Sequence, residues 1–390
     1  MKRTLRTFLV GSWIGLKNIV RHPLYWFCML LLPLFIIFFF TDLMKSGIPE
    51  EMPVGVVDLD NSAMSRKLIR NLDAYQNTKV VARFPNVREA RKAMQQGKIY
   101  AFMYFPKGTE EDLLSSRQPK ISFYYNASIL LAGSLLYKDL RAISTLGSAG
   151  VGAAKMSAMG LTPQQIQAFL QPIIIDAHPL NNPSLNYNVY LSTTMIPICL
   201  SLFIVLVTAH CIGVEMKFGE AQKWLERSDN SIVMALATKF VSHTIIFTLV
   251  MWFSMYWMFG HLGFPHLCST GFLMLEGLLV VLASQGFGIF VFGIFPSLRM
   301  SMSICALWAV LSFSISGFTF PVDYMDAPLR MLSWMFPMRH HFMIYQINIL
   351  NGFSLYYSWS HVMALIIYTL LPLAVLMRIK HVLNKYVYLP

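Results

Sequence analysis

Charged residues are scarce in this sequence. Asp, Glu, Lys and Arg make up only 13% of the 390 residues, whereas soluble domains carry about 25%. Hydrophobic residues make up 56%, and the mean hydropathy is +0.53. This composition excludes an ordinary soluble fold and predicts an integral membrane protein.

Several short motifs are also missing. The chain contains no GxxxxGK[ST] loop and no GxGxxG loop, so neither a P-loop nor a dinucleotide site is expected. The five cysteines form no CxxC pair, so neither a zinc site nor a disulfide framework is indicated. The net charge of +12 flanks apolar segments and does not cluster on a soluble module, which argues against nucleic-acid binding. We expect no catalytic, metal or cofactor-binding residues in this chain.

Six apolar segments are long enough to cross a bilayer core, which needs roughly 20 residues per helix. They lie at about 24–44, 189–214, 235–260, 270–295, 301–320 and 357–378. The predicted fold is an α-helical polytopic membrane protein with six transmembrane helices and an α/β domain inserted outside the cytoplasm, between the first and second. The predicted domains are an interfacial helix (1–22), the first span (23–44), the extracytoplasmic domain (45–187) and the remaining five spans (188–390).

Lys and Arg near the span ends predict the orientation, because cytoplasmic loops carry an excess of them. The connection from 260 to 270 has none, whereas basic residues flank the alternate connections and both terminal segments. Both termini are therefore expected in the cytoplasm. The basic residues concerned are Lys2, Arg3, Arg6, Lys17, Arg21, Lys217, Lys223, Arg227, Lys239, Arg299, Arg378, Lys380 and Lys385.

The segment before the first span has its own periodicity. Apolar residues recur at helical spacing, with basic residues elsewhere on the helix, as in an amphipathic helix at a membrane surface. Arg6, Trp13 and Lys17 are the residues that we assign to this interfacial helix. A plain anchor helix is the alternative. The apolar series is Leu5, Leu9, Trp13, Leu16 and Val20.

The inserted domain opens with the strand-like stretch MPVGVVDLDNS, residues 52–62. Helical patterns at 61–75, 86–96 and 110–114 alternate with strand patterns at 79–84, 100–105 and 120–125, which favours a small α/β unit. From about 128 to 175 the pattern is helical but interrupted by four glycines. Thr162 and Pro163 are typical of a helix N-terminus. The glycines are Gly147, Gly150, Gly152 and Gly160.

Asp58 and Asp60 follow the first strand directly and allow two interpretations. An Asp-x-Asp sequence after a strand is typical of the nucleophile loop of haloacid-dehalogenase-type phosphatases. The further lysine and acidic pair that this chemistry needs do not follow at the right places. Asp and Ser also cap helix N-termini, and capping is the simpler interpretation.

Two segments outside the predicted spans are candidates for a functional role. The loop 215–232 is charged and helical around 221–227, so it is either a solvated loop or a coupling helix that docks into a partner protein. The apolar segment 318–352 is broken by three prolines, which predicts short re-entrant or interfacial helices on the outer side. Its basic side chains, Arg330, Arg339, His340 and His341, are expected to be interfacial anchors, with lipid headgroup contacts as the alternative.

Three ionisable residues lie within the spans: His210, His243 and Glu276. Charges at membrane depth are costly and often functional. All three lie near span ends, so we expect interfacial positions. No proton relay is evident in the pattern.

The order of these parts resembles the membrane subunits of type 2 ABC exporters, also called type V ABC exporter permeases. The similarity covers the amphipathic N-terminal helix and a series of stretches along the chain. These are RHPLYW, PVGVVDLDNSAMSRKLIRNL, GKIYAFMYFPKGTEEDLL, ISFYYNAS, NPSLNYNVYLSTTMIP, VEMKFGEAQKWLERS and SGFTFPVDYMDAPLRMLSWMFPMRHH.

This resemblance implies a half-transporter in a bacterial inner membrane. A second permease subunit, identical or different, would pair with it, and a separate subunit would bind ATP and Mg²⁺. The cargo would be a hydrophobic or amphipathic molecule such as a drug or lipid, and some relatives use a periplasmic adaptor. The fuller acidic motif of many relatives is reduced here to Glu215 and Glu220. The residues implied in coupling to the ATP-binding subunit are Glu215, Glu220, Lys223, Trp224 and Arg227, and those implied at the outer gate are Phe318, Phe320, Pro321, Pro337 and Arg339.

Two other functions stay open at this point. The chain could be a receptor or scaffold that uses its extracytoplasmic domain to bind a partner. It could also be a lipid-modifying membrane enzyme with a site near His340 and His341, although no nucleophile or metal constellation accompanies them.

Overall fold

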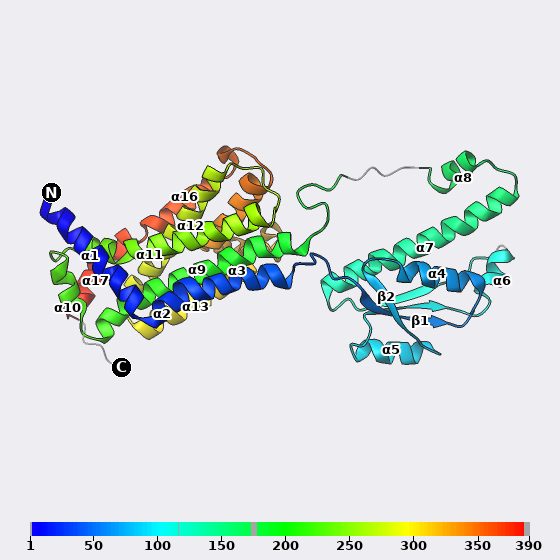
Figure 1. Cartoon of the computed structure of the whole chain (residues 1–390), viewed down its shortest axis with the longest axis horizontal. Coiled ribbons are helices and arrows are strands. Elements are labelled where there is room, and N and C mark those ends of the chain that lie inside the picture. Colours follow the sequence, from blue (N-terminus) through cyan, green and yellow to red (C-terminus); the bar gives the residue numbers. More distant parts are fainter. Residues whose placement is uncertain (1, 116, 173–177, 386–390) are drawn as a thin grey trace. The chain divides into compact units, whose positions relative to one another are not determined.

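The computed structural model describes residues 2–115, 117–172 and 178–385 (Figure 1). Residues 1, 116, 173–177 and 386–390 of the predicted domains lie outside the described residues, as does the side chain of Leu5. The chain forms two compact units. One comprises residues 1–45 and 179–390, here called the helical unit, and the other comprises residues 46–178, here called the α/β unit.

The helical unit contains α1 (Lys2–Arg21), α2 (Pro23–Trp26), a π-helical turn (Phe27–Leu31), α3 (Leu32–Leu43), α9 (Tyr187–Lys217), α10 (Ala221–Arg227), α11 (Ile232–Met255) with a π-helical extension (Tyr256–His261), α12 (Thr270–Ile294), α13 (Leu298–Ile315), α14 (Ala327–Ser333), α15 (Pro337–Ile344) with a π-helical turn (Tyr345–Leu350), α16 (Trp359–Leu370) and α17 (Pro372–Lys385). Short 3₁₀ turns lie at Val322–Tyr324 and Leu355–Tyr357.

Six helices in the described part of the chain are long and apolar enough to cross a membrane. They are Pro23–Leu43, Tyr187–Lys217, Ile232–His261, Thr270–Ile294, Leu298–Ile315 and Trp359–Lys385. The chain is thus a mostly helical, polytopic membrane protein, as the apolar segments predict. The extracytoplasmic location of the α/β unit stays a prediction.

Helices α9 and α12 form the centre of the helical unit. Both are mostly buried, whereas less than a quarter of α3, α13 and the α16–α17 pair is buried. Small residues on α12 allow close approach: a Cβ at Gly286 would lie 2.2 Å from the carbonyl oxygen of Tyr368, and one at Gly288 would lie 2.9 Å from that of Val205. Small residues commonly bring membrane helices together in this way.

The α/β unit is built on a four-stranded sheet with the order β2-β1-β3-β4 (Figure 1). Its strands are β1 (Met52–Asp58), β2 (Thr78–Arg83), β3 (Ala101–Phe105) and β4 (Ser122–Tyr125), and its helices are α4 (Ala63–Asp73), α5 (Val87–Gln95), α6 (Thr109–Leu114), α7 (Leu130–Ala158) and α8 (Pro163–Leu170). β1 pairs parallel with β2 and β3, and β3 pairs antiparallel with β4.

Two apolar clusters sandwich this sheet. Helices α4 and α7 cover one face through Leu68, Leu72 and Leu136, which pack on Val54 and Val56. Helix α5 covers the other face, where Ala90 and Ala93 pack with residues of β1 and β3. Each strand and helix predicted for residues 52–125 lies within about two residues of its observed bounds, a deviation usual at element ends.

Asp60 holds the start of α6, whereas Asp58 closes the turn that leads into α4, whose N-cap is Ser62. One oxygen of Asp58 accepts hydrogen bonds from the backbone N–H groups of Asp60 (3.1 Å) and Asn61 (2.9 Å), and the other accepts the Ser65 hydroxyl (2.8 Å). Asp60 accepts the backbone N–H groups of Thr109 (2.9 Å) and Glu110 (3.2 Å), which begin α6. Both carboxylates are therefore occupied, in agreement with the capping interpretation.

The glycines after residue 128 do not interrupt the helix as the sequence suggests. Helix α7 runs through Gly147, Gly150 and Gly152. A Cβ at Gly147 would lie 2.9 Å from the Leu68 side chain, so this glycine allows α4 to approach. Only Gly160, with φ +84°, follows the end of a helix. Thr162 then forms the predicted N-cap of α8, as part of a capping box.

Candidate functional site

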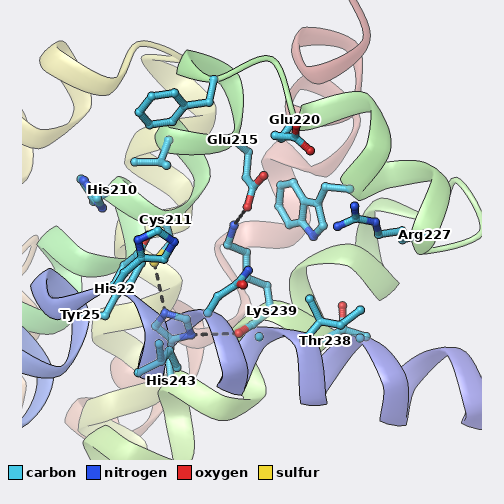
Figure 2. Close-up of a pocket in the computed structure, with 18 of the residues that line it drawn as sticks. His22, Tyr25, His210, Cys211, Glu215, Glu220, Arg227, Thr238, Lys239 and His243 are labelled. Carbon is cyan, nitrogen blue, oxygen red and sulfur yellow. Dashed lines mark hydrogen bonds and ion pairs between the residues drawn. The ribbon is translucent and has the colours of Figure 1, made fainter.

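The candidate site is a cavity of about 570 Å³ in the helical unit, here called the loop pocket. Its walls come from α1, the end of α9, α10, the first half of α11, and Leu298 at the start of α13 (Figure 2). The pocket thus lies between the predicted interfacial helix and the predicted coupling loop.

Helix α1 forms one wall because two glycines bring it onto α11. A Cβ at Gly11 would lie 2.9 Å from the side chain of Thr238, and one at Gly15 would lie 3.4 Å from the Thr238 carbonyl oxygen. The Ser242 hydroxyl donates a 3.1 Å hydrogen bond to the carbonyl oxygen of Ser12. The opposite face of α1 carries exposed apolar side chains, namely Leu9, Val10, Trp13, Leu16 and Val20. The three residues predicted for the interfacial helix are exposed as well: Arg6, Trp13 and Lys17.

The opposite wall depends on a tight turn between α9 and α10. Gly219 adopts φ +70°, a left-handed conformation that glycine accepts readily. The Glu220 N–H then donates a 2.9 Å hydrogen bond back to the carbonyl oxygen of Glu215. This turn folds α10 against the ends of α9 and α11.

A charged and aromatic cluster, here called the Lys239 cluster, joins three helices at this wall. Lys239 on α11 forms an ion pair with Glu215 on α9. Its ammonium group also lies 4.6 Å from the centre of the Trp224 ring on α10. The Glu215 and Lys239 side chains are only 20% and 13% exposed. Because partial burial strengthens ion pairs and cation–π contacts, this cluster stabilises the position of α10.

A second polar group lies deeper in the pocket. His243 Nδ1 lies 2.9 Å from the Lys239 carbonyl oxygen, and its Nε2 lies 3.2 Å from Cys211 Sγ. A carbonyl only accepts, so Nδ1 carries the proton and Nε2 accepts from the thiol. The Tyr25 ring meets His210 and His243 edge-on, with centroids 5.8 and 5.9 Å away. Figure 2 labels these side chains, and its dashed lines mark the two contacts of His243.

The residues implied in coupling differ in their exposure to solvent. Glu220 accepts a 2.9 Å hydrogen bond from Lys223, and this bond lowers the pKa of the Glu220 carboxyl. Lys223 and Arg227 are exposed. Trp224 is only 9% exposed, and its ring faces Lys239 inside the protein rather than a solvent-exposed surface. That these residues couple the chain to the ATP-binding subunit stays a prediction.

Of the residues predicted at the outer gate, Phe318 lies at the first turn of α9, whereas Pro337 lies beside the middle of that helix, near Ile198 and Ser201. The Tyr190 hydroxyl donates a 2.6 Å hydrogen bond to the carbonyl oxygen of Phe318, and Arg339 donates one of 3.1 Å to that of Ser316. Phe318 and Pro337 are buried, whereas Phe320 and Pro321 are exposed.

The two histidines expected at the membrane interface are buried instead. His341 Nδ1 lies 2.5 Å from Glu276 Oε1, and both residues are only 3% exposed. His340 is fully buried, and its Nδ1 lies 3.0 Å from His361 Nδ1. Glu276 and His243 are likewise buried within the protein, and the interfacial depth expected for both stays a prediction. The His341–Glu276 pair fixes α15 to α12, and the His340–His361 pair fixes α15 to α16. Such contacts between distant residues cannot be predicted from a local sequence pattern.

No group of three or more His, Cys, Asp or Glu side chains in the described ranges is arranged to hold a metal ion. Cys211 and His243 are only 1% and 3% exposed. A reactive thiol must be accessible to its reaction partner, and the Cys211 thiol is not. These contacts therefore serve packing and positioning.

In the described part of the chain, six apolar helices, of which α9 and α12 are the most buried, define a polytopic membrane protein. A family model described as ABC-2 family transporter protein matches residues 23–378, nearly the whole chain. The chain therefore belongs to the ABC-2 transporter family, as its resemblance to type 2 ABC exporter permeases predicts. A comparison with curated proteins gave no match.

Membership of this family defines the role of the chain. It is the permease, or membrane subunit, of an ABC transporter, and it is a transport component rather than an enzyme. ABC-2 permeases associate with an ATP-binding subunit.

Proposed function

We propose that this chain is the membrane half of an ATP-driven exporter in a bacterial inner membrane. Two permease subunits pair, and each carries an ATP-binding subunit against the loop 215–232. Both termini lie in the cytoplasm, and the α/β unit lies outside it. The cargo is a hydrophobic or amphipathic molecule taken from the cytoplasm or the inner leaflet, and a periplasmic adaptor receives it.

The Lys239 cluster is the observation that carries this proposal. It joins α10, the short helix in the loop, to the ends of two membrane helices. Force applied to α10 by a docked ATP-binding subunit therefore reaches α9 and α11 directly. A solvated loop without such contacts would absorb the movement.

The first experiment is co-purification of the chain with its ATP-binding subunit, followed by a vanadate-sensitive ATPase assay. Lys223 is exposed on α10 and does not line the pocket, so Lys223→Glu should weaken the complex. Lys239→Gln should preserve the complex but abolish stimulation of ATP hydrolysis by cargo. The exposed Lys138 of the α/β unit provides a matched charge reversal, Lys138→Glu, which should change neither.

Two results would contradict the proposal. A chain that purifies without any ATP-hydrolysing partner would favour a receptor or scaffold. A Lys239→Gln complex with normal cargo-stimulated hydrolysis would remove the cluster from the coupling route.

The topology has its own test. Asn71 and Gln222 are both exposed. In intact spheroplasts, an Asn71→Cys variant should react with a membrane-impermeant thiol reagent, and a Gln222→Cys variant should not. Peptide mass spectrometry separates these sites from the native cysteines, and the reverse pattern would overturn the orientation.

A further inference from the structure

We propose that the loop pocket binds the phosphate headgroup of an anionic phospholipid, which stays bound and is not the cargo. Its volume of about 570 Å³ falls within the 300–1,000 Å³ usual for small-ligand sites. The proposal does not depend on the exporter function, because lipid binding requires no ATP-binding subunit.

The charges of the pocket favour an anion. Its two carboxylates are already engaged, Glu215 by Lys239 and Glu220 by Lys223. Lys217 and Arg227 line the same cavity, and within the described residues neither side chain has a hydrogen-bond or ion-pair partner. In Figure 2 Arg227 extends from α10 on the side of the pocket away from His210. Lys217 lies only over the Phe218 ring, 5.8 Å from its centre, and Arg227 acts on Glu220 at longer range while Lys223 holds that carboxylate directly. The two cations therefore leave a positive charge that a phosphate group would neutralise.

Neutral donors add to this arrangement. The side chains of His22 and His210 line the pocket, and each packs edge-on against the Tyr25 ring, without a hydrogen bond among the described residues. Their ring N–H groups, like the amide of Asn18, are therefore available to phosphate oxygens. The polar groups thus come from α1, α9 and α10 together.

The rest of the wall is apolar, which selects a lipid over a free phosphate ion. Ile14, Ile19, Leu24, Val214 and Leu298 line the cavity beside the polar groups. An inorganic phosphate would leave these side chains against water, whereas the glycerol backbone and first methylenes of a lipid would cover them.

Helix α1 also places the pocket at the depth of lipid headgroups. Its free face presents Leu9, Trp13 and Val20, which are 59%, 69% and 70% exposed. An apolar helix face flanked by basic residues lies in the membrane interface, where Trp is favoured. The other face of the same helix forms the pocket wall. A phospholipid of the leaflet in which α1 lies can therefore enter the loop pocket without passing through water.

Native mass spectrometry of the purified full-length chain tests the proposal, with phosphatidylglycerol and phosphatidylcholine of identical acyl chains as probes. Phosphatidylglycerol should bind more tightly. Near a membrane, each Lys or Arg contributes about 1 kcal/mol to the binding of anionic lipid, which equals about fivefold in affinity. Lys217→Gln and Arg227→Gln should each cause that loss, and the double variant should lose about 25-fold. Lys138→Gln, at an exposed lysine of the α/β unit, is the control and should change nothing.

A second variant and a mapping experiment guard against indirect effects. Val214→Phe should reduce binding by filling the cavity without changing charge. Photoactivatable phosphatidylglycerol in nanodiscs should crosslink to α1 and to the end of α9. Equal binding of the two lipids, an equal loss in Lys138→Gln, or crosslinks confined to other helices would overturn the proposal. Displacement of the lipid by inorganic phosphate would show a free-anion site and would overturn the lipid assignment.

Discussion

The buried contact between Glu276 and His341 allows a quantitative prediction. Phenylalanine at position 341 keeps a ring in place but leaves the Glu276 carboxylate without its partner. Glu276 Oε2 already has no hydrogen-bond partner among the described residues. Removing one partner of a buried pair costs about 3–5 kcal/mol, because the remaining charge stays buried. His341→Phe should therefore lower the free energy of unfolding by that amount.

The double variant distinguishes the contact from mere packing. In Glu276→Leu/His341→Phe no charge stays buried, so we expect it to be more stable than His341→Phe alone, with a cost of about 1–2 kcal/mol. Reversible unfolding in mixed detergent micelles, read by far-ultraviolet circular dichroism, measures all the variants. The half-buried His266 offers a control, His266→Phe, which should cost less than about 1 kcal/mol.

The coupling energy from this cycle decides the question. If Glu276→Leu and His341→Phe have additive costs, the 2.5 Å contact contributes nothing to the fold. The reasoning that these residues fix α15 to α12 would then be refuted.

Three further predictions concern other parts of the chain. Burial raises the pKa of Asp139 on α7, so the folded α/β unit binds its proton more tightly and loses stability as pH rises above the usual value near 4. Asp139→Asn should therefore slow hydrogen exchange of α7 peptides at pH 7 and have less effect at pH 4.5, and equal exchange at pH 7 would contradict this. Gly286→Ala should destabilise the helical unit by about 1–3 kcal/mol because its Cβ meets the Tyr368 carbonyl. Gly271→Ala, with nothing within 4 Å, is the control on the same helix and should unfold at the same detergent concentration as the wild type. Asp58→Ala should cost about 1–2 kcal/mol because the turn before α4 loses its acceptor, whereas Asp58→Asn keeps an acceptor oxygen and should cost less in a chemical unfolding titration; equal costs would refute this role of the Asp58 carboxylate.

The α/β unit could be predicted from sequence because its elements are amphipathic. Alternation of strand and helix patterns identified every element from residue 52 to 125, and the cap at Thr162 followed from local chemistry. These signals are local, since each depends on residues within one or two turns.

The candidate site could be predicted only in part. The charge of the loop 215–232 predicted a functional segment. Helices α9, α11 and α12, however, are apolar on all sides, so their periodicity does not reveal which face packs against a neighbouring helix. The burial of Trp224 depends on Lys239, which lies on another helix. The contact between His341 and Glu276 joins positions 65 residues apart. Such contacts arise from tertiary packing, and a single sequence carries no local signal for them.

Helix α9 gives the transporter a mechanical property. It is one helix of 31 residues, about 46 Å long, with Glu215 in its last turn and Tyr190 in its first. Tyr190 holds the chain at Phe318, while Glu215 belongs to the Lys239 cluster. If α9 tilts by about 5° around its midpoint, each end moves by about 2 Å, in opposite directions. A tilt that carries both halves of α9 across Pro197 would narrow the space beside one end of the helix and widen it beside the other, so the two ends would move in opposition.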